Sequence, residues 1–187
     1  MLELNIEQKK FLLNLARESI KAKLESCSLE IEKPEDELYE RKLGAFVTLH
    51  KFGQLRGCIG QVIPQMSLFD TIVEMAKAAA FGDPRFPNIQ TDEVDNIDIE
   101  ISILSELVRV NDIDEIKVGR DGLLIRKGMY SGLLLPQVAT EQNWDKHTFL
   151  DHTCLKAGLT PGSWQDPQSE LYRFTAEIFS EKEIKNN

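Results

Sequence analysis

Apolar residues recur every three or four positions over residues 6–24, which predicts an amphipathic helix with one buried face. Asn5 and Gln8 at its start resemble a capping box, in which each side chain serves the backbone near the other. A second helix is predicted to begin after Ser67 and to stop at Gly82, because its apolar positions keep the same spacing.

A third helix is predicted from Asp145, as its cap, through about Ala157, with Gly158 as the stop. Residues 25–42 are polar and contain Pro34. This stretch is predicted to be a solvated loop, because no apolar period runs through it.

Strand patterns begin with a hairpin. Side chains alternate over residues 45–50, a turn signal follows at Phe52-Gly53-Gln54, and residues 55–60 form a second short strand. Isoleucines alternate with polar residues over 97–103, which predicts a half-buried strand.

Two shorter apolar runs, 123–125 and 132–135, predict further strands, and residues 171–179 alternate as one more. About six strands and three main helices result, joined mostly by turns rather than by regular crossover helices. That order favours an α+β fold, with an antiparallel or mixed sheet flanked by helices. At 187 residues the chain, residues 1–187, is predicted to be a single domain.

Charge narrows the choice of partners. Lys and Arg total 22 and Asp and Glu total 31, so the net charge is −9. This balance argues against a general nucleic-acid binder and against docking on anionic lipid, although a local basic pocket is compatible with it. No run approaches the roughly 18 apolar residues of a membrane span, and the three scattered cysteines are typical of reduced thiols. We therefore expect a soluble, cytoplasmic protein.

The second strand of the hairpin carries the most informative chemistry. Arg56 and Cys58 lie two residues apart, so an extended segment directs both side chains to one side. A neighbouring guanidinium favours the nucleophilic thiolate, and it also offers a planar fork to an anion. Gly57 and Gly60 leave room for a ligand or another backbone, and His50 precedes the turn. Two hypotheses follow, a Cys58 nucleophile or an Arg56 anion site, beside the simpler interpretation of a tight strand with a small buried thiol.

The segment Asp83-Pro84-Arg85-Phe86-Pro87 is rigid and carries opposite charges two residues apart. It can hold an arginine in a fixed pose toward a site. The alternative is a helix-ending turn with a local ion pair.

A third group of candidates follows the apolar run at 132–135. Pro136-Gln137-Val138 leaves that strand and puts an amide at its end, and Trp144 and Asp145 stand at the next boundary. His147 and Cys154 share one face of the predicted helix, which suggests a metal or a Cys–His pair. Cys154 also belongs to an apolar stripe, however, and a closed zinc site needs about four ligands. No metal site is predicted.

Common cofactor motifs do not occur in the sequence. It has no Walker loop, no GxGxxG after a strand, no HExxH and no GxSxG. We therefore predict no cofactor.

Several stretches together resemble the AMMECR domain family, whose bacterial and archaeal members include protein A of the AmmeMemoRadiSam system. Leu55-Arg56-Gly57-Cys58-Ile59-Gly60 is similar to the hexapeptide signature of that family. The other matching stretches, in the family's order over about residues 10–180, are Phe46-Val47-Thr48-Leu49, Asp83-Pro84-Arg85-Phe86, Gly132-Leu133-Leu134-Leu135-Pro136-Gln137-Val138-Ala139, Trp144-Asp145 and Lys156-Ala157-Gly158-Leu159.

The resemblance implies a compact α+β domain of two intertwined lobes, with the signature segment near a cleft. It implies an unsettled activity and a pathway or complex shared with a Memo-like protein and a radical-SAM protein. One hypothesis is an enzyme with Cys58 as nucleophile, Arg56 orienting an anionic substrate, and His50 or His147 as base. The alternative is a non-catalytic module that binds a small anion or a partner. The expected binding residues are Gly57, Gly60, Asp83, Arg85, Gln137, Trp144 and His147.

Overall fold

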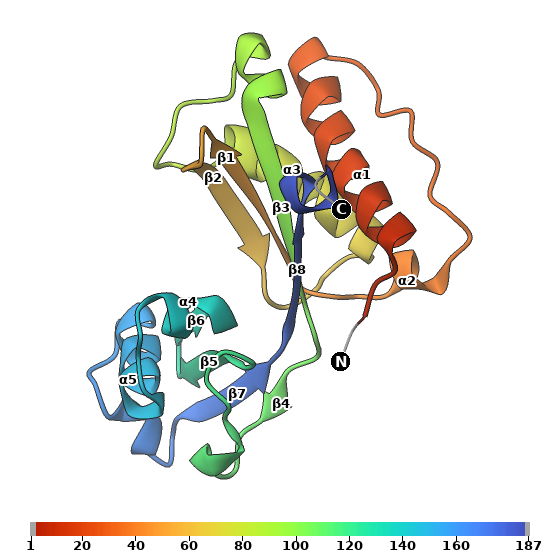
Figure 1. Ribbon diagram of the computed structural model, residues 1–187. Helices are drawn as coiled ribbons and strands as arrows, with labels where there is room; N and C mark the ends of the chain where they lie inside the picture. The colour runs from red at the N-terminus through yellow and green to blue at the C-terminus, as the bar shows by residue number, and fades with distance from the viewer. Residues whose placement is uncertain (1–2, 186–187) are drawn as a thin grey trace. The chain divides into compact units, whose positions relative to one another are not determined.

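The computed structural model describes residues 3–185, and the chain divides into two compact units. Residues 105–176 form one unit, which we call the inserted unit. The described residues on either side, 3–104 and 177–185, form the other, which we call the main unit. Each unit contains one four-stranded sheet with helices. The two sheets can be followed in Figure 1. The predicted α+β class is confirmed.

The main unit begins with α1 (Ile6–Glu25), whose start carries the predicted capping box between Asn5 and Gln8. The side chain of Ser67 caps α3 (Leu68–Phe81) in the same general way. Its smaller helices are α2 (Glu37–Glu40), the 3-10 helix η1 (Thr91–Asn96) and α6 (Glu181–Lys185).

The sheet of the main unit has the strand order β2-β1-β3-β8. Val47 and Leu49 of β1 and the alternate isoleucines of β3 are fully or almost fully buried, and helices α1 and α3 lie on the sheet (Figure 1). The predicted hairpin is confirmed, since β1 and β2 pair antiparallel, and β1 pairs antiparallel with β3 on its other side. The strands are β1 (Ala45–Lys51), β2 (Gln54–Gln61), β3 (Ile97–Leu104) and β8 (Ala176–Ser180).

The tip of the hairpin has two residues with positive φ, Phe52 at 52° and Gly53 at 78°. That backbone suits a two-residue hairpin turn, whose twist matches the twist of the strands. The pairing shifts between Leu49 and His50, which face Gly57 and Leu55, so Arg56 has no partner on β1. A β-bulge therefore interrupts the segment 55–60, which contains the candidate residues Arg56 and Cys58.

The inserted unit has the strand order β4-β7-β5-β6, with antiparallel pairing throughout. Its core joins the buried face of α5 to Leu123 and Ile125 of the sheet. Cys154 lies in this core, as its place in the apolar stripe predicted. The elements are β4 (Val108–Arg109), η2 (Ile113–Glu115), β5 (Gly122–Lys127), β6 (Tyr130–Leu134), α4 (Pro136–Glu141), α5 (Lys146–Lys156), η3 (Ser163–Gln165) and β7 (Glu170–Phe174).

Two local predictions were wrong. Residues 171–179 do not form one strand, because the chain passes from β7 in one sheet to β8 in the other at Thr175. The backbone N–H of Thr175 binds the Ser105 hydroxyl there, so the ladder is interrupted although the alternation continues. The predicted loop at 25–42 contains the single turn α2. Gln137 follows β6, as expected, and lies in α4. No helix in the described range 3–185 is long and apolar enough to cross a membrane.

Candidate functional site

Cys58 lies on the outer strand of the main-unit sheet, opposite Thr48. Its sulfur is half-buried and accepts a hydrogen bond from Thr48 Oγ1 at 3.3 Å. The backbone N–H of Cys58 donates to Asp83 Oδ2 at 2.8 Å, and its carbonyl accepts from Arg85 Nη2 at 3.3 Å. These backbone groups point away from β1, so Thr48 and Cys58 form a non-hydrogen-bonded pair. In such pairs the side chains approach closely, which explains the contact.

The loop after α3 supplies the two residues that hold Cys58 from outside. The buried carboxylate of Asp83 accepts from Arg85 Nε at 2.9 Å and from Arg85 Nη2 at 2.7 Å. These hydrogen bonds, together with the backbone N–H groups of Cys58 and Arg85, hold the pKa of Asp83 well below its usual range. The Asp83 carboxylate in turn raises the pKa of Arg85.

Arg85 still has capacity for a ligand. Its side chain is 54% exposed, and within residues 3–185 its Nη1 takes part in none of the hydrogen bonds that hold the guanidinium. The guanidinium also lies over the Phe86 ring, 5.4 Å from the ring centre. The positive group next to the Cys58 backbone is therefore fixed in place and open to solvent.

Arg56 has the opposite character. It makes a two-point pair with Glu93, with Nε to Oε1 at 3.2 Å and Nη2 to Oε2 at 2.9 Å, and its Nη1 donates to the Pro87 carbonyl at 2.8 Å. The side chain is only 11% exposed. Arg56, with a second bond from Lys51, lowers the pKa of Glu93 to about 2. Arg56 thus fastens the loop 87–93 to the hairpin.

The expected pairing of Arg56 with the Cys58 sulfur depends on regular strand alternation. The bulge leaves Arg56 without a partner on β1, and its guanidinium is bound by Glu93 and the loop carbonyls. No hydrogen bond or ion pair among the described residues joins it to the sulfur. The arginine that contacts Cys58 is Arg85, through the backbone carbonyl.

The two glycines of the signature are positions of close approach within the protein itself. A Cβ on Gly57 would lie 2.2 Å from the carbonyl oxygen of Ala79 in α3. A Cβ on Gly60 would lie 2.3 Å from the Phe46 ring. Gly57 therefore lets α3 pack on the hairpin, and Gly60 makes room for an aromatic ring.

His50 is half-buried on β1, two residues beyond Thr48, and its register partners are Leu55 and Asp98. Two residues along a strand span about 6.6 Å. His50 is thus on the same strand as the hydroxyl that binds the sulfur, but two register positions further along.

The remaining candidates, Gln137, Trp144 and His147, belong to the inserted unit. Trp144 stacks on His152 with ring centres 3.9 Å apart, and His147 meets the edge of Trp164 at 5.8 Å. The Oε1 atom of Gln137 is buried and has no hydrogen-bond partner. The ring contacts of Trp144 and His147 are thus made to residues of the inserted unit itself, around α4 and α5.

Two residues of the site were not anticipated from the sequence. Thr48 could be found only from the register of the hairpin, which places it opposite Cys58. Glu93 carries a local signal, because it forms a capping box with Gln90 at the start of η1.

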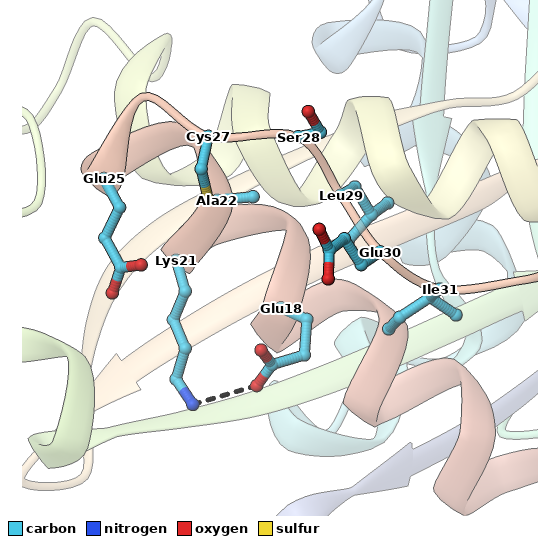
Figure 2. A pocket seen from close by; sticks show the side chains of 9 residues that line it. All are labelled: Glu18, Lys21, Ala22, Glu25, Cys27, Ser28, Leu29, Glu30 and Ile31. Carbon is cyan, nitrogen blue, oxygen red and sulfur yellow. Dashed lines mark hydrogen bonds and ion pairs between the residues drawn. The ribbon is translucent and has the colours of Figure 1, made fainter.

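The other cysteines have different surroundings. Cys154 is fully buried, and this burial raises the pKa of its thiol. Cys27 is exposed beside a hollow of about 480 Å³ between α1 and residues 27–31, shown in Figure 2. No group of three or more His, Cys, Asp or Glu side chains in the part of the chain that the structure describes could hold a metal ion.

The two antiparallel sheets and the strand that carries Leu55–Gly60 define an α+β protein of the AMMECR type. The AMMECR1 family model matches residues 13–179, and the chain belongs to this family. Protein TK0174 of Thermococcus kodakarensis is 46% identical over 195 residues, which cover 97% of this chain and 94% of that protein. Protein MJ0810 of Methanocaldococcus jannaschii is 44% identical, covering 96% and 93%.

A solved structure supports the same assignment. The crystal structure of the uncharacterized protein PH0010 from Pyrococcus horikoshii superposes with a TM-score of 0.83 at 45% identity, and the match covers 92% of this chain and 90% of that one. The names of these relatives state no activity.

Proposed function

We propose that the protein is a thiol-dependent enzyme acting on a small anionic substrate, with Cys58 as the nucleophile and Arg85 as the anion anchor. The observation that carries this proposal concerns Cys58: its half-buried sulfur is hydrogen-bonded by a hydroxyl, and its backbone carbonyl accepts from the exposed, fixed guanidinium of Arg85. Charge-assisted hydrogen bonds from a preorganised guanidinium are among the stronger means of orienting an anion.

The two arginines have different roles in this proposal. Arg56 is a positioning residue, because Glu93 and the Pro87 carbonyl occupy its guanidinium. Arg85 takes the anchoring role, since its Nη1 is available and its side chain is exposed. In this proposal the anion binds to Arg85, in the loop after α3, and not to Arg56 on β2.

The chemical step follows from the residues around the sulfur. His50, acting through a water molecule, takes the thiol proton, and the Thr48 hydroxyl stabilises the negative sulfur with its hydrogen bond. The sulfur electron pair then forms a bond to an electrophilic carbon of the substrate. The group displaced from that carbon leaves with the electrons of the broken bond.

Alkylation with iodoacetate and iodoacetamide tests this function, because the two reagents differ in charge. In both reactions the thiolate bonds to the CH₂ carbon and iodide leaves with the bonding pair. We expect Cys58 to react faster than Cys27, and to prefer iodoacetate over iodoacetamide severalfold more than Cys27 does. Arg85→Gln should remove that preference, whereas Arg109→Gln, which alters another exposed arginine, should keep it. Equal slow labelling of Cys58 and Cys27 would contradict the proposal.

A second candidate is a non-catalytic module that binds an anion or a partner, and one observation favours it. The hydrogen-bond partner of the Cys58 sulfur among the described residues is a hydroxyl, and the strand histidine, His50, lies two positions beyond that hydroxyl on β1. Native mass spectrometry of the protein from its own cells separates the two candidates. An adduct on Cys58 supports the enzyme, and a retained small molecule without an adduct supports the binding module.

The family resemblance adds a Memo-like protein and a radical-SAM protein as proposed partners in a shared cytoplasmic pathway. Affinity purification of the full chain from its own cells tests this part of the proposal. Enrichment of both partners over an unrelated bait of similar charge is the expected result, and their absence at native expression levels argues against a stable complex.

A further inference from the structure

The outer edge of β2 is paired at one position and open at the next. Cys58 directs its N–H and carbonyl away from β1, toward Asp83 and Arg85. Cys58, Ile59 and Gly60 pair in regular register with Thr48, Val47 and Phe46. Because the direction of backbone groups repeats every second residue, Gly60 also directs its N–H and carbonyl outward.

The outward groups of Cys58 and Gly60 are treated differently. The Asp83 carboxylate accepts from the Cys58 N–H and the Arg85 guanidinium donates to its carbonyl, so the two side chains act as a short substitute for a neighbouring strand. The outward N–H and carbonyl of Gly60 have no hydrogen-bond partner among residues 3–185. An open pair of this kind is a ready position for strand addition.

The paired backbone of Cys58 limits what can bind at the open backbone of Gly60. A chain that adds to β2 can exchange two hydrogen bonds with Gly60, but it cannot continue along the strand past Cys58, where Asp83 and Arg85 already hold the backbone. The added chain must therefore end or turn away at this point. A chain end fits this constraint without any turn.

The positive charge beside Cys58 determines whether an N-terminus or a C-terminus of the added chain binds there. Arg85 directs an exposed guanidinium to this place, with Nη1 outside its bonds to Asp83 and Cys58. A guanidinium repels an α-amino group and binds a carboxylate. A C-terminus directed toward Cys58 runs antiparallel to β2, which is the orientation in which one residue exchanges both bonds with Gly60.

We propose that the free edge of β2 captures the C-terminal end of an extended peptide, with its penultimate residue paired to Gly60 and its terminal carboxylate on Arg85. The last residue then lies beside Ile59, and its carboxylate reaches the level of Cys58, about 6.6 Å along the strand from Gly60. This inference rests on Arg85 as the anion anchor of the proposed function, and it names the substrate class of that site as a peptide with a free C-terminus.

The test uses the ¹⁵N-labelled full chain and two pools of N-acetylated pentapeptides of mixed sequence, one ending in a carboxylate and one in an amide. The expected result is a shift of the Gly60 amide resonance and severalfold slower hydrogen exchange with the acid pool, and neither with the amide pool. Arg85→Gln should lower the affinity for the acid pool at least tenfold, while Arg109→Gln should not change it. The amide pool makes the test independent of any effect of the Arg85 change on folding.

A silent Gly60 amide at millimolar peptide, or equal effects of the two pools, would overturn the peptide proposal. Its failure can be told from that of the enzyme proposal. If Cys58 keeps its preference for iodoacetate while Gly60 stays silent, only the peptide is wrong. If Gly60 responds, including in Cys58→Ser, while the alkylation preference is absent, the peptide site stands and the thiol chemistry is wrong. If both fail, Arg85 is not an anion anchor and both proposals fall.

Discussion

Arg17 of α1 pairs with Glu181, 164 positions later in the chain, with Nε to Oε1 at 2.6 Å. Arg17 also donates to the carbonyl oxygens of Val94 and Ile97, and Glu181 accepts from the backbone N–H of Ile99. The hydrogen bond to Glu181 raises the pKa of Arg17. This pair fastens the C-terminal segment, from residue 177 on, to α1, η1 and β3. It therefore joins the two stretches of chain that make up the main unit.

We predict that Glu181→Gln lowers the free energy of unfolding by about 3 kcal/mol, because removal of one charge leaves a largely buried guanidinium without its partner. Urea denaturation at neutral pH measures this effect. Lys10→Ala is a matched control, since it breaks the exposed ion pair with Glu7 and should cost less than about 1 kcal/mol. Equal effects of the two changes would show that the Arg17 pair does not close the unit.

The pair between Arg56 and Glu93 predicts a pH dependence of stability. The pKa of Glu93 is lowered from 4.5 to about 2 in the folded protein, so its stabilising effect is complete above pH 4.5 and is lost as the pH falls toward 2. After solvent screening we expect a loss of about 1–2 kcal/mol over this window. Denaturation at several pH values should show a flatter profile for Glu93→Gln, and an unchanged profile would refute the assignment.

Gly57→Ala is predicted to lower the free energy of unfolding by about 2–3 kcal/mol, because the new Cβ would overlap the backbone oxygen of Ala79 and force α3 away from the hairpin. Gly82→Ala is the matched comparison. It also meets a backbone oxygen, that of Ala78, but at 3.2 Å, and its φ of −128° suits alanine. Thermal denaturation should therefore show a clearly smaller effect for Gly82→Ala than for Gly57→Ala.

Cys154 is predicted to stay unmodified in the native protein. Burial both excludes the reagent and raises the pKa of its thiol, so little thiolate is present at pH 8. Ellman's reagent should titrate the exposed Cys27 at once and Cys154 only after denaturation in urea. Peptide mapping of the labelled sites identifies each thiol, and rapid native labelling of Cys154 would contradict its place in the core.

The sequence by itself determined the elements that depend on neighbouring residues. The capping box of Asn5 and Gln8, the hairpin with its turn at Gly53, and the buried stripe containing Cys154 all depend on contacts within a few positions, so periodicity and cap chemistry were enough to predict them. The same patterns did not reveal the division at Thr175, because side chains alternate in the same way in β7 and β8 while the strands pair in different sheets.

Only the tertiary structure decided which arginine is available at the candidate site. Arg56 and Arg85 are equivalent as residue types, and the sequence favoured Arg56 because it lies two residues from Cys58. The register shift leaves Arg56 without a partner on β1, and the carboxylate of Glu93, 37 positions later, binds its guanidinium. Asp83 holds Arg85 in place, but leaves its Nη1 free for a ligand. Whether a charged group is exposed or paired depends on residues distant in the chain, and short-range patterns carry no information about those distances.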